Sequence, residues 1–186
     1  FHTEWKGKKL NIIDCPGSDD FVGAALTALN VTDTAMLLIN GQFGPEVGTQ
    51  NHFRYTEKLH KPVIFLVNQL DADGCDYDVV VEDLQTIYGQ KVVPVQYPVK
   101  TGADFNALID VILMKKLTWG PDGGEPTLED IPAEEKDKAE AMHKALVEAA
   151  AENDEGLMEK FFETEHLTED EMREGIRKGM ITRSIF

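Results

Sequence analysis

The sequence is short of positive charge and has no long apolar run. Its 186 residues carry 18 lysines and arginines against 34 acidic residues, a formal net charge of -16. Direct binding of nucleic acid needs a basic patch, and none is visible, so we expect no contact with phosphate backbones. No apolar run approaches the roughly 20 residues that span a bilayer, so we expect no membrane association and a cytoplasmic location.

Cysteine, metal-ligand spacing and the phosphate-binding loop are also scarce or missing. Cys15 and Cys75 are too few for a disulfide framework and lack the CxxC spacing of a zinc site, so both are interpreted as reduced thiols. Acids at 71–82 have part of the spacing of a calcium loop, but the position that requires glycine is Asp76. The pattern G-x-x-x-x-G-K-[ST] is absent, because the only Gly-Lys pair, at 7–8, is followed by another lysine.

The first half of the chain alternates apolar runs with amphipathic segments. Strands are predicted at 1–5 and 10–14, as a hairpin, and then at 35–39 and 63–67. Helices are predicted at 19–30, 49–59 and 78–88. Continuous apolar strands separated by helices are typical of a buried parallel sheet with right-handed crossovers, which predicts an α/β fold.

The second half is more acidic and more helical. Residues 120–186 hold 19 acidic and 8 basic side chains. Helices are predicted at 133–153, around 157–162, and after Thr168, which forms a capping-box pattern with Glu171. Before them, the runs at 92–95 and 108–114 fit strand or helix, and we favour strand. We expect these segments to form a small α/β insertion, with most acids on a solvated face.

The segment Asp14-Cys15-Pro16-Gly17 follows the apolar run at 10–13. Ligands of open α/β sheets bind outside the carboxyl ends of the strands. There a carboxylate can hold the water shell of Mg²⁺, and a glycine lets the backbone N–H approach a phosphate oxygen. Taken alone, the segment fits a plain turn between a strand and a helix equally well.

A second polar cluster, Asn68-Gln69-Leu70-Asp71, follows the apolar run at 63–67. A carboxylate can accept two hydrogen bonds from guanine, from its N1–H and its exocyclic amine. Adenine lacks this donor pair, and leaving the carboxylate unpaired costs about 1–3 kcal/mol. An acid-x-x-Gly followed later by Asn-x-x-Asp, both after predicted strands, indicates part of a guanine-nucleotide site.

These motifs resemble those of a known family. Residues 11–21, NIIDCPGSDDF, resemble the switch II signature of the translational GTPases, most closely that of elongation factor G, which usually reads N-I-I-D-T-P-G-H-V-D-F. Residues 68–71 are similar to its N-K-x-D base-recognition motif. The resemblance continues through 97–99, 109–115, Trp119, 131–133 and 157–161, into the subdomain that elongation factor G carries before its last G motif. It covers essentially the whole chain.

The resemblance implies a fold and its division into parts. We expect a partial P-loop-NTPase-like G domain, doubly wound and mostly parallel, with an inserted small α/β subdomain. The expected limits are 1–91 for the G core without its phosphate loop, 92–180 for the insertion, and 181–186 for the return to the G domain. Because the chain opens inside a strand pattern without a methionine, we expect a fragment that ends before the last G motif.

Two residues depart from the family pattern. Ser18 occupies the position of the histidine that positions the attacking water, so no catalytic residue is assigned. A serine hydroxyl is shorter than an imidazole and lacks its two nitrogens, so we expect GTP hydrolysis to be weakened. Gln69 stands in place of the motif lysine, whose stem lies along the guanine ring in the family.

By resemblance, the full-length protein is a ribosome-associated elongation factor that acts in translocation. The expected GTP-binding residues are Asp14, Gly17, Asn68, Gln69 and Asp71, with Asp14 also holding Mg²⁺ through water. GTP and Mg²⁺ are expected as cofactors of the full-length protein, and none is expected in the fragment. The expected partners are the ribosome and its stalk protein, the latter contacted by the insertion.

Two other interpretations stay open. In the first, the protein is a ribosome-binding factor that uses GTP as a structural ligand without turnover, as Ser18 would permit. In the second, it is a doubly wound domain unrelated to GTP, such as a flavodoxin-like binding protein. That interpretation gives no reason for Asn68 and Asp71 to coincide with the switch motif, so it carries little weight.

Overall fold

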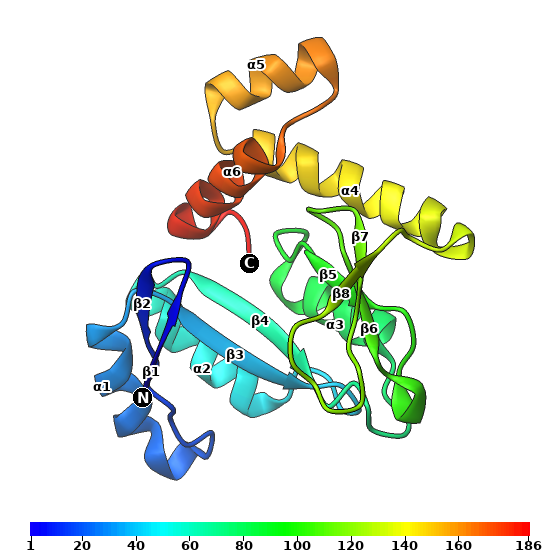
Figure 1. Cartoon of the computed structure of the whole chain (residues 1–186). Helices are drawn as coiled ribbons and strands as arrows, with labels where there is room; N and C mark the ends of the chain where they lie inside the picture. The colour runs from blue at the N-terminus through cyan, green and yellow to red at the C-terminus, as the bar shows by residue number, and fades with distance from the viewer.

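The structure, a computed structural model, describes the backbone of residues 1–186 and every side chain except that of Asp19. It confirms a mixed α/β fold in which a parallel strand pair and helices precede a second sheet with helices of its own (Figure 1). The strands are β1 His2–Trp5, β2 Lys8–Asn11, β3 Ala35–Asn40, β4 Val63–Asn68, β5 Gln96–Pro98, β6 Ala107–Asp110, β7 Lys115–Thr118 and β8 Thr127–Glu129. The α-helices are α1 Val22–Val31, α2 Val47–Lys58, α3 Tyr77–Tyr88, α4 Lys136–Ala151, α5 Glu155–Thr164 and α6 Glu169–Thr182. Short 3-10 helices are η1 Asp19–Phe21, η2 Gly102–Asp104 and η3 Ala133–Glu135.

The N-terminal hairpin is shorter and more isolated than predicted. β1 and β2 pair in antiparallel fashion, from His2 opposite Asn11 to Trp5 opposite Lys8, and form a two-stranded sheet of their own. The predicted strand at 10–14 is wrong in its extent, because β2 ends at Asn11. Every residue of both strands is exposed, and β2 begins with two lysines, so it presents no apolar face to bury against β3.

β3 and β4 form the parallel pair that the sequence predicts. Their register runs from Ala35 opposite Val63 to Asn40 opposite Asn68, so both strands end at the same edge. α2 connects them and lies behind the pair in Figure 1. One face is buried, but the other is open, with Leu38 62% exposed, so the expectation of a sheet buried on both faces is wrong.

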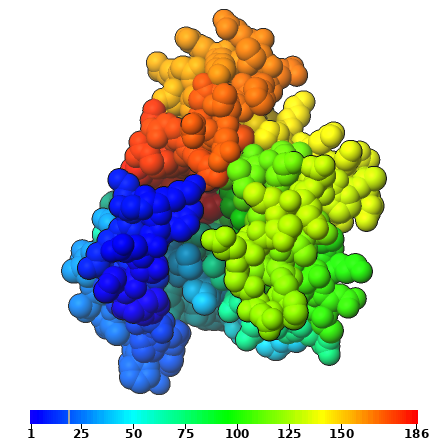
Figure 2. Space-filling model, in the orientation of Figure 1, coloured from blue at the N-terminus to red at the C-terminus, as the bar shows by residue number. Residues whose placement is uncertain are grey.

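The open face forms the floor of a recess. Figure 2 shows it between the N-terminal hairpin, in blue, and the yellow-green surface around β8. The exposed apolar side chains on this face alternate along the two strands, as a pleated pair requires: Met36, Leu38, Ile64 and Leu66.

The opposite face of β3 and β4 packs on α2 and α3 through an aromatic cluster. Phe53 of α2 lies 4.2 Å from Tyr88 of α3 and 5.3 Å from Phe186, measured between ring centroids. Phe65 of β4 stacks on Tyr88 at 5.0 Å. The Arg183 guanidinium lies over Phe53 and Phe186, 5.2 Å from each centroid. Aromatic pairs at these distances add about 0.5–1.5 kcal/mol beyond the burial of their area.

The last residues of the chain pack against the first unit, which comprises β3, β4, α2 and α3. The Phe186 backbone N–H donates to the Lys91 carbonyl at 2.8 Å, and the Val93 N–H donates to the Phe186 carbonyl at 3.2 Å. The predicted boundaries of the insertion, after residues 91 and 180, stay a prediction.

Among the described residues, no helix combines the length and the apolar character that a membrane span would require.

The second sheet is antiparallel, in the order β5-β6-β7-β8. The strand favoured at 108–114 begins as β6 but ends at Asp110, and 92–95 is not a strand. The cause is local. One Asp110 carboxylate oxygen accepts from the Ile112 and Leu113 N–H groups, at 3.0 and 2.9 Å, and turns the chain into β7. Tyr97 and Ile109 pack under α4 in a buried cluster.

Three helices complete the second unit. The capping box predicted from Thr168 and Glu171 is confirmed at the start of α6, with both reciprocal hydrogen bonds present. α6 crosses α4 closely at Gly175, where a β-carbon would lie 2.4 Å from the Ala150 carbonyl oxygen. Glycine is therefore required at this crossing. Asp154 caps the start of α5 by accepting from the Leu157 N–H at 3.0 Å.

Candidate functional site

The candidate site is built where β3 and β4 end. Asn40 and Asn68 are the last residues of the two strands and lie opposite each other. The Gly41 N–H donates to the Asn68 carbonyl at 2.9 Å, which extends the pairing by one step. A β-carbon at Gly41 would lie 2.6 Å from the Cys75 sulfur and 2.9 Å from the Asn68 oxygen, so only glycine permits this approach.

Hydrogen bonds of the Asn40 and Gln42 side chains join the two strand ends. The Asn40 amide Nδ2 donates to the Gln69 Oε1 at 2.7 Å, while the Asn40 Oδ1 accepts from the Gln42 N–H at 2.8 Å. The side-chain amide of Gln42 in turn donates to the backbone carbonyl oxygen of Asp73. These contacts tie the loop after β4 to the loop after β3. Nothing in the sequence pattern singled out Asn40 or Gln42.

The loop after β4 is also held from the far side. The Gly102 N–H, in η2, donates to the Leu70 carbonyl at 2.8 Å. The Thr101 hydroxyl donates to the Cys75 carbonyl at 2.9 Å. Leu70 is buried, whereas Asp71 is exposed, so this loop presents its carboxylate to solvent while its backbone is fixed.

The buried thiol under this loop is electrostatically disfavoured as a thiolate. Burial raises the pKa of Cys75, and the neighbouring Asp76 and Asp71 carboxylates raise it further. Asp76 also caps α3, because its carboxylate accepts from the Val79 N–H at 3.2 Å. Cys75 is thus a packing residue against Gly41, in agreement with its interpretation as a reduced thiol.

Asp14 and Gly17 follow the N-terminal hairpin. Asp14 is exposed and comes three residues after β2, which belongs to a sheet separate from β3 and β4, so its predicted place beside the base-recognition residues stays a prediction. The described interactions do not join Asp14 to the loop after β4. The Gly17 carbonyl lies 3.9 Å from the place of a β-carbon at Gly48, near the start of α2. A β-carbon at Gly17 itself would meet nothing within 4 Å.

Ser18 acts locally in this structure. Its hydroxyl accepts from the Asp20 N–H at 3.4 Å, and its carbonyl accepts from the Phe21 N–H at 2.9 Å. Both contacts shape the turn that leads into α1. The side chain is exposed.

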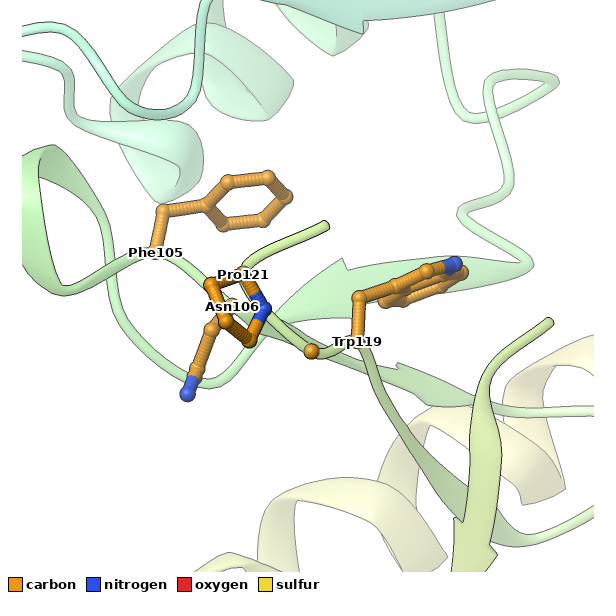
Figure 3. Close-up of a pocket in the computed structure, with 5 residues that line it drawn as sticks. Phe105, Asn106, Trp119 and Pro121 are labelled. Atoms are coloured by element: carbon orange, nitrogen blue, oxygen red, sulfur yellow. The ribbon is translucent and has the colours of Figure 1, made fainter. Parts of the chain in front are cut away.

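Two hollows on the surface do not include this site. One, of about 400 Å³, is lined by Phe105, Asn106, Trp119, Gly120 and Pro121. Figure 3 shows the side chains of Phe105, Asn106, Trp119 and Pro121 around this hollow. It includes none of the residues predicted to bind a nucleotide. Across the side chains that the structure describes, no group of three His, Cys, Asp or Glu residues could hold a metal ion.

Comparison with known proteins identifies the family. The family described as "Elongation factor Tu GTP binding domain" matches residues 1–164. The chain belongs to this family. A protein of Thermus thermophilus known from a crystal structure is 29% identical in sequence and superposes with a TM-score of 0.89. That match covers 99% of this chain and 27% of the other, so the chain spans about a quarter of the length of the protein it matches.

Membership in the elongation factor Tu GTP-binding-domain family gives the two motifs their context. The structure places Asn68, Gln69 and Asp71 together on one fixed loop and leaves Asp14, Gly17 and Ser18 on a separate segment. An exposed carboxylate beside a paired amide suits the recognition of a ring with adjacent N–H donors. The arrangement is therefore a candidate base-recognition half-site.

Proposed function

We propose that this chain is part of a ribosome-associated, GTP-binding translation elongation factor that resembles elongation factor G and acts in translocation. The observation that supports the proposal most is the loop of Asn68, Gln69 and Asp71 at the end of β4, fixed from both sides within a chain of this family. In the full-length protein, the Asp71 carboxylate accepts from the guanine N1–H and exocyclic amine.

GTP and Mg²⁺ are the cofactors that this proposal requires. The residues fit the base half, since Asp71 is exposed and its loop is held in place. For the phosphate half, Gly17 leaves room for a close approach, and the exposed Asp14 can hold the water shell of Mg²⁺. One carboxylate does not make a complete metal site, so phosphate oxygens and water supply the other ligands. The 186-residue chain by itself is therefore expected to bind GTP negligibly, and micromolar binding by calorimetry would contradict this.

Slow GTP hydrolysis is the second part of the proposal. The Ser18 hydroxyl accepts a hydrogen bond from the Asp20 N–H within a turn, and serine has no imidazole nitrogen that could position water. The test is single-turnover hydrolysis by the full-length protein with ribosomes. Ser18→His should accelerate hydrolysis by at least about tenfold, since positioned acid–base groups contribute about 10²–10⁴-fold.

Ser18→Ala is the matched control for that experiment. It removes the same hydroxyl without adding a nitrogen, so hydrolysis should stay at the slow rate of the native protein. Hydrolysis by the native protein as fast as in a histidine-bearing relative would refute the proposal of weakened turnover.

A second function is favoured by the same residue. The protein binds GTP as a structural ligand and acts on the ribosome by occupancy. The two functions differ in whether movement of tRNA and mRNA needs hydrolysis. If translocation proceeds equally with a non-hydrolysable GTP analogue over many rounds, occupancy is the function; if it stops after one round, turnover is needed.

The insertion supplies the proposed contact with the ribosomal stalk protein. α4 carries exposed charged side chains, among them Glu140, Lys144 and Glu148. Reversing both acids, as Glu140→Lys with Glu148→Lys, should reduce recruitment of the factor to ribosomes that carry the stalk. Glu82→Lys on the exposed face of α3 is the control, and equal recruitment of both variants would contradict the contact.

A further inference from the structure

The loop that bears the candidate base-recognition residues adopts a conformation that needs support. Gln69 has a φ of 59°, in the left-handed region that residues other than glycine seldom adopt. Its carbonyl accepts from the Ala72 N–H at 3.0 Å, which closes the turn. Strained backbone of this kind persists only where the surroundings fix it. A side chain that contacts Gln69 is the candidate for holding this conformation.

Asn40 contacts the loop after β3 and the loop after β4 through one side-chain amide group. Its Nδ2 donates to Gln69 Oε1 at 2.7 Å, and its Oδ1 accepts from the Gln42 N–H at 2.8 Å. Because both ends of the amide are used, its plane is fixed. Asn40 is also half-buried, whereas Gln69 is exposed, so Asn40 is the better-anchored partner of the pair.

We propose that Asn40 is a positioning residue of the base site: it orients Gln69 and holds the Asn68–Asp71 loop in the geometry that recognises guanine. This inference rests on the proposed GTP-binding function. Asn40 does not touch the base itself. It acts through Gln69, whose side-chain oxygen accepts from it, and through the turn that places Asp71.

The chemistry of the contact predicts how substitutions behave. Leucine has a similar volume but can neither donate nor accept, so Asn40→Leu releases both Gln69 and Gln42. Aspartate keeps two acceptors, so Asn40→Asp retains the Gln42 N–H contact. It also accepts from Gln69 once that side-chain amide turns over, which costs little at an exposed position.

The experiment is nucleotide binding by the full-length protein, with GDP and IDP as probes. IDP lacks the exocyclic amine that donates a hydrogen bond to Asp71 in the proposed site. The ratio of the two Kd values therefore reports the placement of Asp71. Asn40→Leu should weaken GDP binding by about three- to tenfold, the range for one or two lost hydrogen bonds. It should also reduce the preference for GDP over IDP.

Two variants separate positioning from a general loss of fold. Asn40→Asp should bind GDP within about twofold of the native protein. Asn30→Leu is the matched control, since the Asn30 side chain donates to the Leu26 carbonyl within α1, on an element outside the loop. A loss of stability alone would weaken GDP and IDP alike and leave their ratio unchanged.

The outcomes are distinct. A lower GDP affinity and a smaller GDP preference in Asn40→Leu, with both recovered in Asn40→Asp, support the proposal. If the native protein binds GDP and Asn40→Leu binds it equally well with the same preference, the positioning role is overturned and the proposed function stands. If the native protein does not bind GDP, the proposed function fails first, and the role of Asn40 in it fails as well.

Discussion

Gly175→Ala tests the close crossing of α6 over α4. The added β-carbon would lie 2.4 Å from the Ala150 carbonyl oxygen, 2.8 Å from its carbonyl carbon and 3.0 Å from its β-carbon. The shortest of these is about 1 Å below the 3.4 Å at which ordinary contact begins. Since the obstacle is the backbone of a packed helix and not the end of a flexible side chain, α6 has to move away.

The magnitude follows from two opposing terms. Overpacking a close contact costs about 1–3 kcal/mol. Alanine recovers up to about 1 kcal/mol of helix propensity relative to glycine. The contact with backbone atoms places the cost in the upper half of its range, so we expect a net loss of about 1–2 kcal/mol in the free energy of unfolding.

Urea unfolding followed by circular dichroism measures this loss. With a slope of about 2 kcal/mol per molar urea, the middle of the usual range, the midpoint should fall by roughly 0.5–1 M. Gly23→Ala is the matched control, because a β-carbon there meets nothing within 4 Å in α1. It should leave the midpoint unchanged or raise it. A midpoint for Gly175→Ala at or above that of the native chain would refute the close crossing.

Three further predictions concern ionisable side chains. Hydrogen bonds from Lys160 and Thr168 lower the pKa of Glu171 to about 2, so the stability it contributes is complete above its ordinary value near 4.5 and is lost as the pH falls toward 2. Glu171→Gln should flatten the acid limb of the stability curve; an unchanged limb would count against the contact. Burial, and then the Glu57 carboxylate, raise the pKa of Tyr88 to about 12, so its contribution is present below its ordinary value near 10 and disappears between pH 10 and 12. Tyr88→Phe should show a smaller alkaline loss of stability, measured by unfolding at each pH. Arg183→Met should cost about 1–2 kcal/mol by removing hydrogen bonds from the guanidinium to the Thr56 hydroxyl of α2 and to the Lys61 carbonyl. Arg177→Met, exposed beside Glu174, should change stability by less than about 0.5 kcal/mol in the same urea assay.

The elements that the sequence predicts correctly are those whose signals are local. The parallel pair follows from two apolar runs flanking a helical pattern, and it occurs as β3 and β4. The start of α6 follows from Thr168 and Glu171, because a capping box needs only four adjacent residues. The position of Asn68 and Asp71 at the end of a strand follows in the same way.

Two of the errors concern apolar runs that were predicted as strands and end earlier than expected. The pattern at 108–114 is apolar throughout apart from Asp110, which accepts from two N–H groups that follow it and ends the strand. The run at 10–13 is largely apolar as well, yet β2 stops at Asn11 and leaves Ile13 51% exposed. Apolar character alone therefore predicts neither pairing nor burial.

The contact of Asn40 with Gln69 could not be predicted, because the two residues are 29 positions apart and neither belongs to a pattern that links them. Only the register of β3 and β4 brings them together. This contact gives the two departures from the family pattern different meanings. Gln69 has a defined partner at the strand edge, whereas the described hydrogen bond of the Ser18 side chain lies within the turn that it begins. We infer that the replacement at Gln69 is accommodated by its surroundings and preserves base binding. The replacement at Ser18 has no such compensation among the side chains described, so turnover is the step we expect to be slow.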